Sequence, residues 1–113
     1  MVIIRFENGA DWYKANWIFR QLADDAIARS PGDAELASLM EQAQALGLLA
    51  LEDQKEGVAS RAVEAMRLVA EETLRGTLPG WRNSKPDDPR GHRSYLDAMA
   101  ELLALLRGAA GEP

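Results

Sequence analysis

The chain has 113 residues, of which 47% are hydrophobic and 27% are charged, and its formal net charge is −5. This length accommodates one hydrophobic core, and the acidic balance argues against binding to nucleic acid or to an anionic membrane. The sequence contains no cysteine, which excludes disulfides, thiolate zinc sites and a cysteine nucleophile. No stretch reaches the ~18 apolar residues of a membrane span, so we expect a soluble cytoplasmic protein.

The N-terminal segment is the only β-rich part of the sequence. Apolar residues alternate along "VIIRF", which predicts a strand over residues 2–6. The Asn8-Gly9 pair that follows is common in hairpins, but the residues after it have helical spacing. We therefore interpret Asn8 as the N-cap of a helix over residues 10–28.

Three further helices are predicted from apolar residues spaced three and four apart. Ser30 is an expected N-cap, and Gly47 and Gly76 are expected C-terminal stops. The three helices are predicted over residues 31–47, 53–75 and 94–107. We expect the tail over residues 108–113 to fray. The sequence thus predicts one domain over residues 1–113, a mainly α fold. It is a small four-helix bundle with a short N-terminal strand and a long loop before the last helix.

The predicted strand needs a pairing partner, because a lone strand leaves backbone groups unsatisfied. One possibility is residues 48–51, whose pattern fits either a strand or a helix. A second is the same strand of another copy, which would make a homodimer. A third is an extended arm packed on the bundle with water along its edge.

The segment over residues 76–93 differs in character from its surroundings. It has 18 residues, with four basic side chains against two aspartates, in an otherwise acidic chain. Such long loops tend to be functional. Its candidate binding residues are Trp81, Arg82, Lys85, Arg90, His92 and Arg93. They fit an anionic small molecule, a phosphorylated group or an acidic protein surface. Alternatively, the segment is a structural strap with Trp81 packed into the bundle.

No catalytic set is recognisable. His92 is the only histidine, and no nucleophile motif stands beside it, although histidine can serve as a general acid or base. A single histidine cannot make a histidine-cluster metal site. Helical bundles can gather carboxylates around Mg²⁺ or Mn²⁺, and the candidate pairs are Asp24 with Asp25, Glu52 with Glu56, and Glu71 with Glu72. These residues fall mostly opposite the apolar stripes and fit solvated helix faces. We therefore predict no catalytic residue, no metal and no cofactor.

A second candidate surface involves the N-terminal strand and the first helix. Its interface residues are Ile3, Arg5, Tyr13 and Trp17. The alternative is that other elements cover the two aromatic side chains and complete the core.

These surfaces lead to one main hypothesis for the function. The protein is a non-enzymatic interaction domain of the inhibitor, immunity or adaptor type, acting through the 76–93 segment and the adjoining aromatic surface. The alternatives are a binding protein or enzyme for an anionic or phosphorylated small molecule, and a structural subunit of a homo-oligomer.

Overall fold

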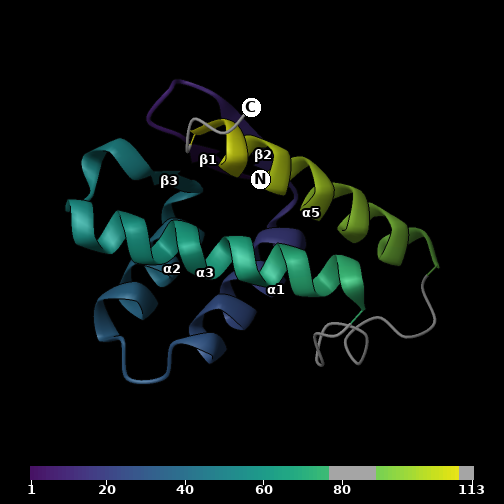
Figure 1. Ribbon diagram of the computed structural model, residues 1–113, viewed down its shortest axis with the longest axis horizontal. Helices are drawn as coiled ribbons and strands as arrows, with labels where there is room; N and C mark the ends of the chain where they lie inside the picture. Colours follow the sequence, from purple (N-terminus) through teal and green to yellow (C-terminus); the bar gives the residue numbers. More distant parts are fainter. Residues whose placement is uncertain (77–88, 110–113) are drawn as a thin grey trace.

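Four helices and a three-stranded sheet make up residues 1–76 and 89–109, the part of the chain that the computed structural model describes. In chain order the elements are β1 (Val2–Arg5), β2 (Asp11–Lys14), α1 (Asn16–Arg29), α2 (Ala34–Leu46), β3 (Leu48–Ala50), the 3-10 turn η1 (Leu51–Asp53), α3 (Glu56–Arg75) and α5 (Pro89–Ala109). In the view of Figure 1, α1 and α2 lie behind α3, and the sheet lies behind the C-terminal half of α5.

A hairpin joins β1 to β2, where the sequence had predicted the start of a helix. The Phe6 N–H donates to the Ala10 carbonyl at 2.9 Å, and the Gly9 N–H donates to the Phe6 carbonyl at 3.0 Å. Gly9 has φ +85°, a left-handed conformation that glycine adopts without steric cost. The Asn8 Oδ1 accepts from the Ala10 N–H at 3.0 Å, so this side chain closes the turn and caps no helix.

The first helix, α1, begins at Asn16, and the prediction of a helix from residue 10 is wrong. Trp12 is fully buried while Tyr13 is 52% exposed, which is the alternation of a strand. The helical interpretation failed because it counted Trp12, an inward-facing residue of β2, as part of the same apolar stripe as Phe19 and Leu22 of α1.

β1 is the central strand of the sheet. It pairs antiparallel with β2 and parallel with β3, so that Ile3 lies beside both Tyr13 and Leu48. Pairing of the N-terminal strand with the segment that begins at Leu48 is thereby confirmed. Because both edges of β1 are occupied, the predicted pairing of this strand with its twin in a second copy is wrong.

The start of α2 also differs from the prediction. Its N-cap is Asp33, whose carboxylate accepts from the Leu36 N–H at 3.1 Å. Ser30 is not the cap, because Gly32 follows it with φ +88° and no helix can continue through that conformation. The predicted stop at Gly47 is confirmed, with φ +73°.

The last two helices are displaced from their predicted starts. α3 begins at Glu56, after η1, and its predicted stop at Gly76 is confirmed, with φ +74°. α5 begins at Pro89, inside the segment predicted as a loop, because proline suits the first turn of a helix. Residues 77–88 and 110–113 lie outside the described residues, and with them the first part of the predicted loop and most of the predicted tail.

The core lies between the helices and the inner face of the sheet. Its largest fully buried side chains are Trp12, Tyr95, Phe6, Phe19, Ile4, Leu22, Leu36, Met40, Leu49, Met66, Met99 and Leu102. The Trp12 Nε1–H donates to the Ala98 carbonyl of α5 at 3.1 Å. Lys14 forms an ion pair with Glu101 of the same helix at 2.6 Å. These two contacts hold one face of the hairpin against α5. Neither contact involves the opposite face of the sheet.

Candidate interaction surface

The candidate binding residues of the 76–93 segment fall into two groups. Those outside the described residues are Trp81, Arg82 and Lys85. Those in the first turns of α5 are Arg90, His92 and Arg93. Arg90 and Arg93 are exposed and three positions apart, so they are neighbours on one helix face, while His92 is half-buried. The last part of the predicted loop, residues 89–93, is therefore the start of α5, and the helix fixes the relative positions of these three side chains.

Trp17 lies apart from the strand residues with which the sequence grouped it. It is half-buried on α1, and its ring stacks on Tyr95 of α5 with centroids 6.2 Å apart. Tyr95 is fully buried, and burial, together with the charge of Asp25, raises the pKa of its phenol. Trp17 therefore packs at the margin of the core between two helices.

The other three predicted interface residues share the outer face of the sheet. Ile3 pairs with Tyr13 in β2 and with Leu48 in β3, and Arg5 pairs with Asp11. Paired residues point to the same face of a sheet, and the residues between them in each strand face the core. A row formed by Leu48, Ile3 and Tyr13 therefore crosses all three strands on the face turned away from the core.

The row is apolar and continues at the β3 end. Tyr13 is 52% exposed and Leu48 is 36% exposed. Met1 and Leu46 are also exposed, and each is two residues from a member of the row, Met1 from Ile3 and Leu46 from Leu48. The Ile3 N–H donates to the Gly47 carbonyl at 3.0 Å, and the Met1 carbonyl oxygen packs against Gly47. The five residues Met1, Ile3, Tyr13, Leu46 and Leu48 are termed the sheet patch.

The part of the outer face around Arg5, the last residue of β1, is acidic. The Arg5 Nε lies 3.2 Å from Asp11 Oδ1, and this hydrogen bond raises the pKa of Arg5. Glu52 and Asp53 of η1 act on the same guanidinium electrostatically and are exposed. One cation among three carboxylates leaves this end with an excess of negative charge. The sheet patch therefore has an acidic rim.

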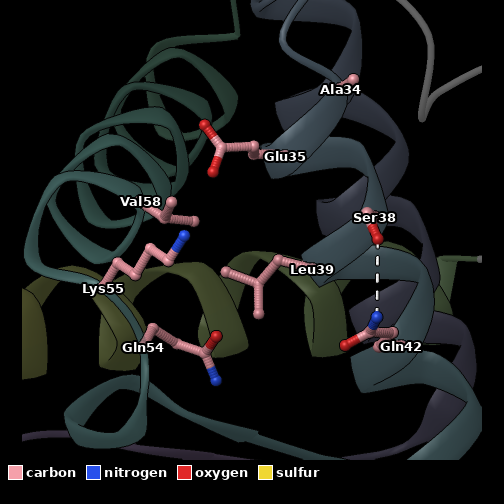
Figure 2. Close-up of a pocket in the computed structure, with 8 residues that line it drawn as sticks. All are labelled: Ala34, Glu35, Ser38, Leu39, Gln42, Gln54, Lys55 and Val58. Atoms are coloured by element: carbon pink, nitrogen blue, oxygen red, sulfur yellow. Dashed lines mark hydrogen bonds between the residues drawn. The ribbon is translucent and has the colours of Figure 1, made fainter.

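A groove of about 370 Å³ lies between α2 and the start of α3. Its lining residues, shown in Figure 2, are Ala34, Glu35, Ser38, Leu39, Gln42, Gln54, Lys55 and Val58. Glu35 is held by Arg61 at 3.1 Å, and the Gln42 amide donates to the Ser38 hydroxyl at 3.5 Å. The groove mixes both charges and neutral amides around an apolar floor, and its lining contains no nucleophile paired with a base.

Asp25 is a half-buried carboxylate on α1. Burial raises its pKa, and the neighbouring Asp24 acts in the same direction. The Gln21 Nε2 donates to both carboxylate oxygens, at 3.3 and 3.2 Å, which opposes the effect. Because the charged form is disfavoured in the fold, ionisation of Asp25 weakens the native state.

Within residues 1–76 and 89–109, no three His, Asp or Glu side chains gather closely enough to hold a metal ion. Among the helices described, none has both the length and the apolar composition of a membrane span. No protein-family model, no curated protein and no solved structure matches the chain.

Sequence reasoning missed three members of the sheet patch: Met1, Leu46 and Leu48. Leu46 was assigned to a helix and Leu48 to a segment of undecided structure. Only the parallel pairing of β3 with β1 places Leu48 on the outer face beside Ile3. The one available signal was the two-residue period of a strand: if "LLA" is a strand, Leu48 and Leu49 face opposite sides of the sheet.

Proposed function

We propose that the protein is a non-enzymatic interaction domain that binds a different protein through the sheet patch. The observation that carries this proposal is a row of exposed Leu48, half-buried Ile3 and exposed Tyr13, in register across three strands whose other face forms the core. Monomeric proteins rarely expose a contiguous apolar patch of this kind unless it is used in binding. Tyrosine is a favoured anchor at such interfaces.

The charge of the surroundings selects the kind of partner. The rim contains Asp11, Glu52 and Asp53 around Arg5, and the whole chain has a net charge of −5. Patch-to-patch pairing of two copies would bring these acidic rims together, whereas a basic surface is attracted. The partner is therefore a protein whose contact surface has apolar side chains flanked by lysine or arginine.

Participation of the 76–93 segment in binding remains a separate prediction. Arg90 and Arg93 are exposed at the start of α5, and an acidic or phosphorylated group would suit them. The alternative of a small-molecule protein remains a prediction, because no feature of the α2–α3 groove favours it. The alternative of a structural oligomer subunit also remains a prediction.

The test uses point variants of the sheet patch and a purified partner. Affinity capture supplies a candidate partner, and support comes only from binding measured by calorimetry with that protein in pure form. We expect Tyr13→Ser and Leu48→Ser each to weaken binding by about tenfold or more, because interface anchors contribute on the order of 1–2 kcal/mol. The matched control is Leu74→Ser, since Leu74 is 41% exposed on the last turn of α3.

Two further readouts separate loss of binding from loss of fold. Both patch variants should retain the far-ultraviolet circular dichroism spectrum of the parent, because their side chains lie outside the core. A double charge reversal, Glu52→Lys with Asp53→Lys, should slow association and reduce its dependence on salt. Unchanged Kd in the folded Tyr13→Ser and Leu48→Ser variants overturns the proposal.

A further inference from the structure

The open edge of the sheet lies along β2. The Phe6 N–H points toward β2 and donates to the Ala10 carbonyl, and successive residues of a strand direct their backbone groups to alternate sides. The pair of Ile3 with Tyr13 is therefore non-hydrogen-bonded, and so is the pair of Arg5 with Asp11. In agreement, the Ile3 N–H points to the other side and donates to the Gly47 carbonyl.

It follows that Asp11 and Tyr13 direct their backbone groups away from β1. Each presents one N–H and one C=O along the edge of the sheet, and no other described strand pairs with β2. The opposite edge, along β3, differs because the Ala50 carbonyl accepts from the Gln54 side chain at 3.2 Å. Among the described residues, β2 is the edge that retains a regular pair of donors and acceptors.

We propose that two copies of the chain pair through their β2 strands, antiparallel and around a two-fold axis at Trp12. In this register Asp11 of each copy lies opposite Tyr13 of the partner subunit. All four N–H groups and all four C=O groups that the two residues present then have partners. The two three-stranded sheets become one six-stranded sheet.

Other registers of the same pairing are less favourable. Centring the axis on Asp11 brings two like charges directly opposite each other. Centring it on Tyr13 places Asp11 opposite Ala15, whose carbonyl already accepts from the Ile18 N–H at 3.1 Å and the Phe19 N–H at 3.3 Å. A shift by one residue would place Tyr13 opposite Trp12 of the partner subunit, whose backbone groups point toward β1, so the bonds between the two edges would not form. The register centred on Trp12 avoids all three conflicts.

The pairing goes beyond the proposed function and has a consequence for it. In the six-stranded sheet the outer faces of the two copies are continuous, so two sheet patches lie side by side. A partner with two matching surfaces would bind with increased avidity. The two Asp11 residues are diagonal neighbours across the seam, and each carboxylate is paired with Arg5 of its own copy. Glu52 and Asp53 lie outside β2, so these parts of the rims do not take part in the edge contact.

The primary experiment compares oligomeric state in two variants of one position. Sedimentation equilibrium between about 10 µM and 1 mM covers the range of a weak dimer. We expect the mass of the parent to rise from 12.4 kDa toward twice that value. Tyr13→Pro should abolish the rise, because it removes an edge donor without breaking the ladder to β1. Tyr13→Ala should retain the rise, because it keeps the N–H.

Three outcomes overturn the proposal: a parent that stays monomeric throughout, a dimer that survives Tyr13→Pro, and a dimer that Tyr13→Ala removes as completely. The last would show that side chains, and not the strand edge, make the contact. If the chain proves to be monomeric, the expected loss of partner binding in the Leu48→Ser variant still stands. The two proposals can therefore fail independently.

A cross-linking experiment tests the register even where Tyr13→Pro does not fold. The chain has no cysteine, so introduced thiols are the only ones present. Opposed residues of a hydrogen-bonded pair have Cα atoms about 5.5 Å apart, within disulfide range. Mixing Asp11→Cys chains with Tyr13→Cys chains under oxidising conditions should yield the mixed dimer in excess over either self-dimer. A mixture without that excess contradicts the register.

Discussion

The attachment of the β1–β2 hairpin to α5 is tested most directly by replacing the buried Trp12 with a smaller aromatic residue. Trp12 is fully buried, and its Nε1–H donates to the Ala98 carbonyl of α5 at 3.1 Å. In the Trp12→Phe variant both this hydrogen bond and part of the packed ring are lost, while the strand alternation is kept. The change therefore probes how the hairpin is held on α5, and leaves the secondary structure intact.

The expected cost has two parts. Ala98 keeps its place in the hydrogen-bond ladder of α5, so the lost bond from Trp12 costs about 1 kcal/mol. The smaller ring leaves a cavity that the surrounding core fills only partly, which costs a further ~1–2 kcal/mol. The free energy of unfolding should therefore fall by about 2–3 kcal/mol, and Tm by roughly 10 °C for a domain of this size.

Urea unfolding followed by circular dichroism measures this loss, with Tyr13→Phe as the matched control. Tyr13 is the next residue of the same strand and is 52% exposed, so its variant should stay within about 0.5 kcal/mol of the parent. If the two variants lose equal stability, or if Trp12→Phe loses less than about 0.5 kcal/mol, the anchoring of the hairpin by Trp12 is refuted.

Two other predictions concern a glycine stop and a half-buried carboxylate. Gly47→Ala should cost about 1–2 kcal/mol in urea unfolding, because its φ is +73° and the added Cβ would lie 3.1 Å from the Met1 carbonyl oxygen. Gly32→Ala, with φ +88° and no atom within 4 Å of the added Cβ, should cost less, and equal losses would contradict the Met1 contact. Burial raises the pKa of Asp25 above its usual 3.8, so its contribution to stability is present at low pH and is lost as pH rises through the folded-state value. Asp25→Asn should therefore be more stable than the parent at about pH 7 and similar to it at about pH 3, and a variant less stable at pH 7 contradicts this assignment.

The helical part of the fold could be predicted because its signals are local. Apolar residues spaced three and four apart identified the helices that became α2, α3 and α5. Gly47 and Gly76 were recognised as stops because a left-handed residue after a helix is nearly always glycine. Helix starts were less certain, since Ser30 and Asp33 are both good caps and only the conformation of Gly32 decides between them.

The sheet and the sheet patch could not be predicted in the same way. The Asn8-Gly9 pair is a genuine hairpin signal, but the residues after it fit both a strand and a helix over so short a distance. The position of Leu48 beside Ile3 depends on pairing between segments more than 40 residues apart in the sequence. Of the four predicted interface residues, the structure brings Ile3, Arg5 and Tyr13 onto one face and places Trp17 against α5.

The central claim, that the sheet patch binds a basic protein, is tested most directly by mapping the bound surface. Hydrogen exchange of the full chain would be measured with and without the purified partner, at matched concentration and salt. We expect added protection in β1, β2 and β3, with α3 unchanged. Protection confined to the first turns of α5, or to the α2–α3 groove, would contradict the claim and transfer binding to those residues.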